Sequence, residues 1–436
     1  MGYTRRRRGP KPAEGGEGGE EDGAERRDRG KAVPDGVVLV SGKLGSRDAT
    51  YKLAPASVDR PIAKLHGWAF WEAIGKPQHV CAPMVEASEL AFRHLCRKYG
   101  TTLCYTPMIH ARLFLEDEAY RLDAFGPDDG GEGDRPLIAQ FCANDPETFL
   151  AAAQLLPPRV DAVDLNLGCP QGIAKRGNYG SFLMDDFALV FRLINTMHHN
   201  LGVPITAKIR VFESEEKTLQ YAKCVQDAGA QVLTVHGRTR DEKGPEAPLA
   251  DWDLIQKVKA HVSIPVISNG NVVSFDDIAA CLQHTKADAV MSAEWLRRNP
   301  AIFYGGENVC LFKMAREYIA LVRRYPAGNG VVKNHLFKML SSNPGGFNEH
   351  GDLRERLAMC FGLDEMEVVF EELAERRGPE PSYPTATHQD LLPKSQKAPD
   401  PDKAKSARAG RSDRERKGRE EEEEEELVVD IFSLEL

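Results

Sequence analysis

The chain has 436 residues, of which 42% are hydrophobic and 28% are charged, and its formal net charge is −9 at pH 7. This length and hydrophobic content allow a large core and more than one domain. Nine scattered cysteines without a CxxC pair predict reduced thiols in a cytoplasmic or nuclear protein. Because no apolar run approaches the roughly 20 residues of a membrane span, the sequence excludes a membrane-embedded protein.

The two ends of the chain are poor in core-forming residues. Residues 1–60 mix Gly, Glu and Arg, and residues 377–436 are rich in Pro, Lys, Arg and Glu. These compositions predict disordered charged tails, which leaves residues 61–376 for the compact protein. Seven consecutive glutamates, residues 420–426, account for most of the negative charge, so the net charge of the chain does not describe its compact part.

Eight short apolar segments between residues 79 and 292 are separated by one helix-sized connection each. The segments are 79–84, 102–105, 137–141, 162–167, 205–209, 232–236, 265–269 and 289–292. Continuous apolar strands that alternate with helices predict a parallel sheet buried on both faces, and eight such units predict a (β/α)8 TIM barrel over residues 61–300. The Gly- and Asp-rich stretch 126–134 carries no motif, and we interpret it as a solvated insertion.

After residue 300, helical periodicity replaces this alternation. Four apolar stripes, within residues 311–322, 332–339, 353–359 and 366–373, predict a small C-terminal helical domain over residues 301–376. Between residues 297 and 338, eight basic residues face only Glu307 and Glu317, which predicts a local basic surface that can contact phosphates. The basic residues are Arg297, Arg298, Lys313, Arg316, Arg323, Arg324, Lys333 and Lys338.

The ends of the predicted strands carry polar or otherwise unusual residues at the edge where TIM barrels hold their active sites. A lone His or Lys at such a place is often structural, but contributions from seven strands at one edge favour a functional site. The residues are Pro83, Met84, Gln140, Asn166, Cys169, Lys208, His236, Arg238, Asn269, Gly270, Asn271, Ser292, Ala293 and Glu294.

Cys169 lies in a Gly-Cys-Pro turn directly after the strand that ends near Asn166. A buried cysteine that acts as a small hydrophobic residue is the common alternative. Its position between Gly168 and Pro170 at the catalytic edge of a barrel favours a chemical role instead.

The ligand that suits these residues is a flavin. The sequence shows no glycine-rich dinucleotide or P-loop motif after a strand and no His, Cys or carboxylate spacing for a metal. Gln140 and Asn166 can hydrogen-bond the polar edge of the ring, and Lys208 can place positive charge near its reduced form. The backbone amides of residues 269–271 can approach a phosphate, and Cys169 then serves as a proton donor.

Over almost all of residues 75–375 the sequence resembles the tRNA-dihydrouridine synthase family. The resemblance is carried by ordered motifs at βα spacing, and segments 105–108, 170–177 and 291–294 look like the eukaryotic branch that modifies D-loop positions 16 and 17. The motifs are Ala82-Pro83-Met84, residues 140–146 and 165–170, Ala207-Lys208-Ile209-Arg210, residues 235–240, Asn269-Gly270-Asn271 and residues 290–294.

The resemblance implies a role for each matching position. Cys169 would protonate uracil C5 after reduced FMN delivers hydride to C6, and NADPH or NADH would be the reductant. Asn166 would also help to seat the base, and no metal is implied. The residues implied for FMN are Ala82, Pro83, Met84, Gln140, Asn166, Lys208, His236, Asn269, Gly270, Asn271, Ala293 and Glu294. The residues expected to contact tRNA are Asn166, Arg176, Arg238, Arg323, Arg324, Lys333 and Lys338.

The chemistry of uridine reduction agrees with this assignment. A flavin and a general acid must flank one ring, the base must be flipped out of the folded tRNA, and a basic helical domain can hold the neighbouring phosphates. Two alternatives stay open: an FMN barrel that acts on free pyrimidines, and an RNA-binding barrel without catalysis. The basic helical domain argues against the first, and the joint presence of Cys169, Lys208 and His236 argues against the second. We expect no obligate protein partner.

Overall fold

The computed structural model describes residues 37–41, 50–53, 64–244, 247–305, 309–341 and 344–378. The chain divides into two compact units, residues 1–56 and 57–436. In the first, β1 (Val37–Ser41) pairs antiparallel with β2 (Thr50–Leu53), a pair that the sequence did not predict. The predicted disordered tails otherwise lie outside the described residues.

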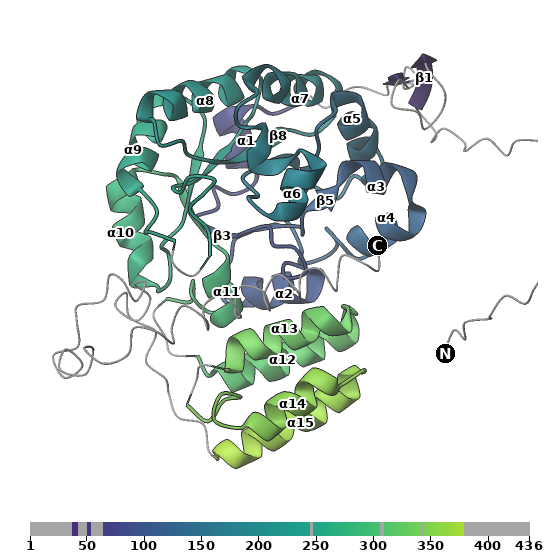
Figure 1. Cartoon of the computed structure of the whole chain (residues 1–436), viewed down its shortest axis with the longest axis vertical. Helices are drawn as coiled ribbons and strands as arrows, with labels where there is room; N and C mark the ends of the chain where they lie inside the picture. The colour runs from purple at the N-terminus through teal and green to yellow at the C-terminus, as the bar shows by residue number, and fades with distance from the viewer. Residues whose placement is uncertain are drawn as a thin grey trace, which may run out of the picture. The chain divides into compact units, whose positions relative to one another are not determined.

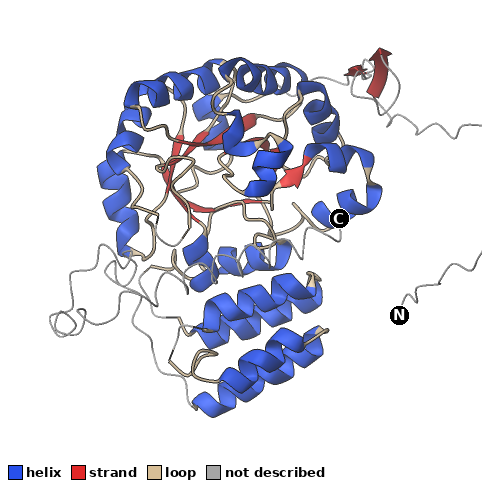
Figure 2. Ribbon diagram, viewed as in Figure 1, coloured by secondary structure: helices blue, strands red, loops and turns tan. Residues whose placement is uncertain are grey.

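Eight parallel strands close into a barrel, as the sequence predicts. Their order is β4-β3-β11-β10-β9-β8-β7-β6, and β4 pairs directly with β6 to close the ring. Figure 2 shows the strands as a ring inside the helices. A two-residue strand, β5 (Ile109–His110), adds to β6 and was not predicted. The barrel strands are β3 (His79–Cys81), β4 (Leu103–Tyr105), β6 (Leu137–Cys142), β7 (Ala162–Leu167), β8 (Ile205–Arg210), β9 (Leu233–His236), β10 (Val266–Asn269) and β11 (Ala289–Ser292).

Helices follow the strands and surround the ring, and none of the described helices is long and apolar enough to cross a membrane. Local sequence explains their starts. Pro146 opens α5, and the Asp145 carboxylate accepts a hydrogen bond from the backbone N–H of Thr148 at 2.9 Å. The helices are α1 (Gly67–Ala73), α2 (Leu90–Lys98), α3 (Ala111–Glu116), α4 (Glu118–Ala124), α5 (Pro146–Gln154), α6 (Gly172–Gly177), α7 (Phe187–Asn200), α8 (Glu215–Asp227), α9 (Trp252–His261), α10 (Asp276–Thr285) and α11 (Glu294–Arg298).

The strands send alternate side chains to the helices and into the barrel. Val163, Leu165 and Leu167 of β7 belong to the large core between strands and helices. A second apolar cluster fills the barrel near the start of the strands, where Ala162 packs with the Phe70 and Trp71 side chains of α1. Closer to the carboxyl ends the inward positions become polar, as in the series Ala162, Asp164 and Asn166. The barrel is therefore closed by apolar packing at one end and lined with polar groups at the other.

Four further helices follow the barrel: α12 (Leu311–Arg324), α13 (Asn329–Leu340), α14 (Gly351–Met359) and α15 (Leu363–Arg377). All four contain the apolar stripes that the sequence predicts, with Tyr318, Leu336, Leu353 and Phe370 fully buried. In this helical bundle α12 packs against α2 and α13 packs against α11, while α14 and α15 lie on the side away from the barrel (Figure 1).

The stretch 126–134 is only in part the solvated insertion that its composition suggests, because residues 127, 128, 132 and 133 are exposed whereas residues 130 and 134 are buried. Asp134 is fully buried, and its carboxylate accepts hydrogen bonds from Arg93 Nε at 2.9 Å and Arg93 Nη2 at 2.6 Å. Arg93 is also fully buried on α2 and donates to Asp129 Oδ1 at 2.5 Å. The insertion thus supplies the acids that neutralise a buried arginine, a partnership that the Gly- and Asp-rich composition conceals.

Candidate active site

Cys169 lies in a turn that its neighbours hold rigidly. The Asn166 Oδ1 atom accepts hydrogen bonds from the backbone N–H groups of Gly168 at 3.0 Å and Cys169 at 2.9 Å. The Cys169 carbonyl accepts from the Ser181 hydroxyl at 2.9 Å. Gly180 packs so closely, with φ +63°, that a Cβ there would lie 2.7 Å from the Cys169 carbonyl oxygen. The turn therefore needs a glycine at 180 and an acceptor at 166.

The Cys169 side chain is half-buried, and its surroundings keep it protonated. Burial raises the pKa of the thiol, and the Gln171 backbone together with the Arg210 and Lys208 charges opposes that rise. The net direction is upward, which favours the thiol over the thiolate at neutral pH. A protonated thiol near two cations is suited to donate a proton and to be stabilised as the anion that remains.

Four basic groups lie on β8, at the end of β9 and just beyond it: Lys208, Arg210, His236 and Arg238. Burial and the neighbouring Arg210 lower the pKa of Lys208 to about 8, and burial and Arg238 lower the pKa of Arg210 to about 10. Within the described residues, Lys208 Nζ makes no hydrogen bond. Neighbouring cations that repel one another and lower one another's pKa would be stabilised by an anionic ligand. These basic groups therefore fit a flavin phosphate or a reduced flavin ring.

His236 is held as a neutral acceptor. Burial, followed by the charges of Lys208, Arg210 and Arg238, lowers the pKa of His236 well below its ordinary value. Arg238 Nη1 lies 3.1 Å from His236 Nε2, and since the guanidinium can only donate, this nitrogen accepts. Arg238 also donates to Asn271 Oδ1 at 3.0 Å and to the Pro248 carbonyl at 2.6 Å. Arg238 is therefore tied to predicted cofactor residues, although the sequence analysis assigned it to the substrate.

The predicted phosphate loop, residues 269–271, is built by close backbone packing. Asn271 has φ +64°, and its side chain bonds the backbone of Ala250 in both directions at 3.0 Å. Gly270 has φ +115°, and a Cβ there would lie 2.5 Å from Ala250 Cβ. Asn269 Nδ2 donates to the Met291 carbonyl at 3.0 Å. The Asn269 and Asn271 side chains are used to hold the loop, so the groups that remain available to a ligand are those of the loop backbone.

Two other predicted cofactor segments lie at neighbouring strand ends. The backbone N–H of Ala82 donates to the Ser292 carbonyl at 3.1 Å, which ties β3 to β11 beyond their ladder. Pro83 and Met84 are half-buried after it. Ala293 precedes α11 as its N-terminal flanking residue. The structure thus brings the Ala82-Pro83-Met84 and Ala293-Glu294 segments together.

The Glu294 carboxylate is engaged with the helical bundle. It accepts from Lys338 of α13 at 3.0 Å, from Arg298 at 3.1 Å and from Arg297 at 3.1 Å. Arg297 in turn donates to Asn334 of α13 at 2.7 Å. Burial raises the pKa of Glu294, but the Lys338 and Arg297 charges outweigh it and hold the pKa below its ordinary value. The side chain that was expected at the cofactor therefore joins barrel and bundle.

The predicted basic surface is less free than the local charge count indicates. Arg323 pairs with Asp364 at 2.6 Å and with Glu367, and Lys338 pairs with Glu294. Lys333 donates to the Ala358 carbonyl at 2.8 Å. All of these partners lie outside residues 297–338, so counting the charges within that range missed them. Arg324 is exposed and lies over the Tyr325 ring, 5.1 Å from its centre, and Arg176 is exposed on α6.

Two residues at the site received no role in the sequence analysis, although Asp164 lies in the predicted strand 162–167 and Arg210 in the motif 207–210. Asp164 is fully buried inside the barrel beneath Asn166, and Arg210 Nε donates to the Gly168 carbonyl at 2.7 Å while its Nη1 donates to the Thr239 carbonyl at 2.7 Å. The signal for both was available, because a charge within an otherwise apolar strand must have a partner inside the fold.

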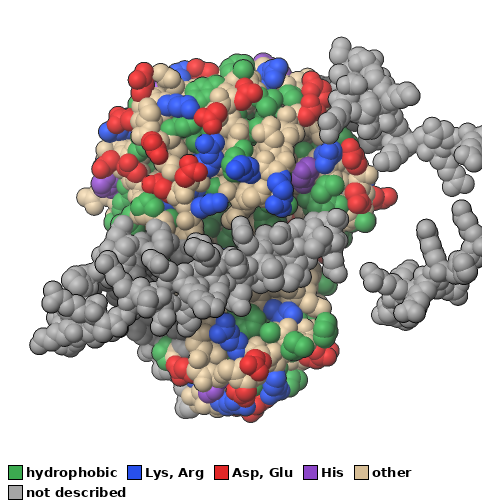
Figure 3. Space-filling view, viewed as in Figure 1, with side chains coloured by type: hydrophobic (Ala, Val, Ile, Leu, Met, Phe, Trp, Pro, Cys, Tyr) green, Lys and Arg blue, Asp and Glu red, His purple; other side chains and the backbone are tan. Residues whose placement is uncertain are grey.

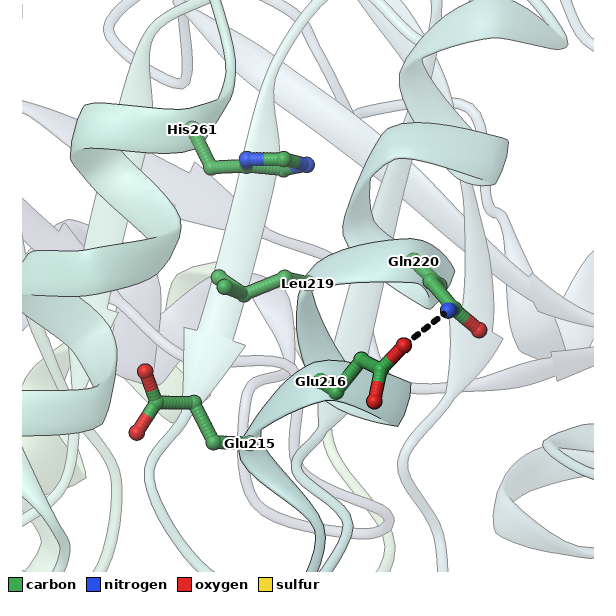
Figure 4. Close-up of a pocket in the computed structure, with 5 residues that line it drawn as sticks. All are labelled: Glu215, Glu216, Leu219, Gln220 and His261. Carbon is green, nitrogen blue, oxygen red and sulfur yellow. Dashed lines mark hydrogen bonds between the residues drawn. The ribbon is translucent and has the colours of Figure 1, made fainter.

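A surface groove of about 390 Å³ lies elsewhere, on the outer wall of the barrel. Figure 4 shows its lining, with Glu215, Glu216, Leu219 and Gln220 of α8 opposite His261 of α9. None of the predicted site residues lines it. Within the described ranges, no group of three or more His, Cys, Asp or Glu residues is arranged to hold a metal ion.

Comparisons with known proteins identify the family of the chain. The model of the dihydrouridine synthase family matches residues 80–371, which run from β3 to α15. A protein of Saccharomyces cerevisiae named tRNA-dihydrouridine(16/17) synthase is 48% identical over 309 residues, covering 68% of this chain and 72% of its own. The chain belongs to the dihydrouridine synthase family.

Other relatives within the family are less similar or match a shorter stretch. A Rattus norvegicus protein named as like the 16/17 synthase is 47% identical over 313 residues, covering 72% of this chain and 70% of its own. A Mus musculus protein named as like the tRNA-dihydrouridine(20a/20b) synthase is 38% identical over 240 residues, covering 54% of this chain and 72% of its own. Among these dihydrouridine synthases, the chain is more similar to those named for positions 16 and 17.

Proposed function

We propose that this dihydrouridine synthase reduces the C5=C6 bond of uridine at positions 16 and 17 in the D-loop of tRNA, with FMN as the flavin and NAD(P)H as the reductant. The single observation that carries the proposal is the rigid Cys169 turn beside a cluster of buried cations at the mouth of a barrel from this family. The protein acts where tRNA is processed, in the cytoplasm or the nucleus.

The residues at the mouth suit FMN. Lys208, which has no hydrogen-bond partner within the described residues, would face the electron-rich side of the ring, and Gln140 and Asn166 would bond its polar edge. The backbone of residues 269–271, with His236 and Arg238 beside it, would hold the phosphate. When bound, the flavin supplies the hydride that C6 of uracil accepts.

Cys169 supplies the second hydrogen. Its thiol donates a proton to C5, so that the double bond gains one hydride and one proton and no charge is left on the base. The thiolate that remains lies in the field of Arg210 and Lys208, and it recovers a proton from solvent at the half-buried mouth. Arg210 also fixes the Gly168 carbonyl, which keeps the thiol at one position.

The tRNA would be held by the mouth and the helical bundle together. A base in a folded tRNA must be flipped out to enter a barrel, and cations on both sides of the entry can hold the flanking phosphates. Arg176 on α6 and Arg324 at the end of α12 are exposed and suited to this role. Lys333 donates to a neutral backbone carbonyl and would still contribute its charge, whereas Arg323 and Lys338 are paired with carboxylates, which compensate their charge.

The proposal is tested with purified protein and a tRNA transcript that contains no modified bases. We expect a yellow protein from which acid releases FMN, and NADPH-dependent formation of dihydrouridine at positions 16 and 17, mapped by reverse transcription and mass spectrometry. Dihydrouridine at position 20a or 20b alone would contradict the assigned positions. NADPH-dependent reduction of free uracil at a rate equal to that of tRNA would favour the alternative, an FMN barrel for free pyrimidines.

A further inference from the structure

Three inward side chains on neighbouring strands form a row below the Cys169 turn. Gln140 of β6, Asp164 of β7 and Thr206 of β8 are register partners across the sheet, and all three are fully buried. The Asp164 carboxylate accepts from the Thr206 hydroxyl at 2.6 Å and from Gln140 Nε2 at 2.9 Å. Gln140 Oε1 in turn accepts from Asn166 Nδ2 at 2.8 Å.

This row continues into the turn that holds Cys169. Asn166 Oδ1 accepts from the backbone N–H groups of Gly168 and Cys169. The result is one continuous hydrogen-bond chain, which runs from Asp164 through the Gln140 and Asn166 amides to the turn. We call it the amide relay.

The two ends of the amide relay allow only one direction. An ionised carboxylate can only accept, and the two backbone N–H groups can only donate. Each amide between them has one donating and one accepting end. All four hydrogen bonds of the relay are made only when Gln140 turns Nε2 toward Asp164 and Asn166 turns Oδ1 toward the turn.

We propose that Asp164 is a positioning residue for Cys169 and for the ligands above it: its carboxylate fixes the orientation of the Gln140 and Asn166 amides, and through them the backbone of the catalytic turn. The inference rests on the proposed function, because it takes Cys169 as the proton donor.

A rule for recognition follows from the fixed direction. Asn166 Oδ1 already accepts two hydrogen bonds, and Gln140 Oε1 accepts one. Asn166 has one N–H left, and Gln140 has one N–H and one lone pair of Oε1 left; these N–H groups make no further hydrogen bond within the described residues. The atom that meets Asn166 must therefore be an acceptor, such as a carbonyl oxygen or an unprotonated ring nitrogen, and an acceptor also suits the free N–H of Gln140. Both a flavin ring and a uracil carry such atoms.

The first test compares two substitutions of Asp164 with a matched control. Asp164→Asn keeps an acceptor for Gln140, Asp164→Ala removes it, and Thr206→Val removes a hydrogen bond from the same row without touching the amide relay. The measured quantity is the rate at which iodoacetamide alkylates Cys169 in the FMN-loaded protein, followed by peptide mass spectrometry. We expect about a tenfold change for Asp164→Ala, the size of a mispositioned group's effect, and wild-type rates for the other two.

The same variants separate positioning from binding. In single-turnover experiments, Asp164→Ala should slow the transfer to uridine about tenfold at saturating tRNA, whereas Asp164→Asn should stay close to wild type. An Asp164→Asn protein as impaired as Asp164→Ala, or a Thr206→Val protein equally impaired, would overturn the proposal. The alkylation rate does not depend on uridine reduction, so a failure of the proposed function would leave it interpretable.

The second test reverses the relay and does not require Asp164→Ala alone to fold. Asn166→Asp places a carboxylate that cannot donate to Gln140, so the relay breaks and the alkylation rate of Cys169 should change. In the double variant with Asp164→Asn, the new amide at position 164 donates to Gln140, and the new carboxylate at position 166 accepts from Gln140. The hydrogen-bond chain is then unbroken, and the alkylation rate of Cys169 should return to the wild-type value. Adding Asp164→Ala removes the charge repulsion without supplying a donor. If Asp164→Asn and Asp164→Ala restored the alkylation rate equally, relief of charge repulsion alone would explain the rescue, and the proposal of an amide relay would be overturned.

Discussion

The thiol of Cys169 is under two opposing influences that decide its chemistry. Burial raises its pKa, and the Gln171 backbone, Arg210 and Lys208 oppose the rise without cancelling it. In a nucleophilic cysteine the nearby positive charges outweigh burial, so that the pKa is lowered and the thiolate predominates. The structure therefore supports the role of a proton donor.

Removing this donor should separate the two halves of the reaction. For Cys169→Ala we expect normal FMN content and normal flavin reduction by NADPH, but uridine reduction slowed by about 10²-fold or more, the usual contribution of a general acid. The acid form is required and its pKa is raised, so the wild-type rate should fall only as the pH rises above the ordinary thiol value of about 8.5. A single-turnover pH series measures both. Equal product from Cys169→Ala and wild type would remove Cys169 from the mechanism.

Asp164 should cost stability at neutral pH. Burial raises the pKa of this carboxyl to about 6, and the Thr206 and Gln140 hydrogen bonds only partly offset the rise. A carboxyl with a higher pKa in the folded state than in the unfolded state favours folding when protonated. Its stabilising effect is present below the unfolded value of about 4 and is lost as the pH rises through 6.

The corresponding prediction concerns Asp164→Asn, which is neutral at every pH. At about pH 8 the variant should be more stable than the wild type by roughly 2–3 kcal/mol, since two pKa units correspond to that amount. The difference should shrink at about pH 5. Urea unfolding of both proteins at the two pH values measures it. A variant that is less stable than the wild type at about pH 8 would show that the charge is compensated within the barrel.

At this scale the sequence predicted which positions gather at the mouth but not how they are connected. Cys169, Lys208 and His236 were found because polar residues at strand ends share one edge of a parallel sheet. The role of Asp164 was missed because its partners, Gln140 and Thr206, are set by the register of three strands, which no single segment reveals.

Between elements, a second buried acid joins the barrel to the helical bundle. Glu89, just before α2, accepts from the Tyr318 hydroxyl of α12 at 2.8 Å and lies 3.1 Å from His335 Nε2 of α13. Burial raises the pKa of Glu89, but His335 and the Tyr318 hydroxyl outweigh it and hold the pKa below its ordinary value. Phe92 of α2 stacks on His335, with ring centres 4.1 Å apart. One carboxylate thus fixes two helices.

Glu89→Ala should loosen the bundle while the barrel stays folded. Removing one partner of a buried, hydrogen-bonded group costs about 3–5 kcal/mol, whereas Tyr318→Phe, the matched control, should cost about 1 kcal/mol. We expect normal FMN content, weaker tRNA binding and earlier unfolding of α12 and α13 by hydrogen exchange. Because the pKa of Glu89 is lowered, its stabilising effect is present at neutral pH and is lost only as the pH falls below the ordinary glutamate value of about 4.3. Unchanged exchange in α12 and α13 would contradict this role.

The elements themselves were largely predictable. Each barrel strand is short, apolar and followed by a helix, and the bundle helices show a clear stripe, so the local pattern and the tertiary packing agree. The predictions failed where two interacting residues come from different helices, strands or loops. Residues 126–134 look solvated until Arg93 of α2 is placed beside Asp134. The two-residue β5 is too short to leave a pattern.

For the whole molecule, the distribution of charge matters more than its sum. On the barrel face in Figure 3, Lys and Arg side chains lie near the middle and acidic side chains lie mostly toward the rim. The net charge of −9 applies to the full sequence, including residues 420–426, which lie outside the described residues. Because the Debye length is about 8 Å at physiological salt, a bound tRNA responds to the nearby cations.

Arg324→Glu should therefore weaken tRNA binding in a salt-dependent way. The loss of one phosphate contact should lower the slope of log affinity against log salt by about one. Lys223→Glu is a suitable control, because it makes the same charge change at an exposed residue of α8, on the outer wall of the barrel. Fluorescence anisotropy with labelled tRNA at several salt concentrations measures both. Equal loss in the two variants would mean that total charge, rather than this site, governs binding.

The basic surface shows what the sequence can say about the whole molecule. Counting charges along residues 297–338 located a cationic region, but the acids that pair with Arg323 come from α15, 41 and 44 positions away. Linear distance cannot reveal such pairs. The resemblance to a family nevertheless predicted the correct fold, because its motifs recur once per βα unit and so follow the whole ring.

The direct pairing of β4 with β6 has a further consequence. The ring closes without residues 106–136, which leave it after β4 and return at β6. Changes in the length or sequence of this excursion need not break any of the eight barrel pairings, provided that Asp134 still reaches Arg93. The excursion leaves at the carboxyl ends of the strands, where the mouth lies, and returns at their amino ends. Its first part is therefore a place where relatives of this protein can diverge in which part of an RNA they accept without rebuilding the catalytic barrel.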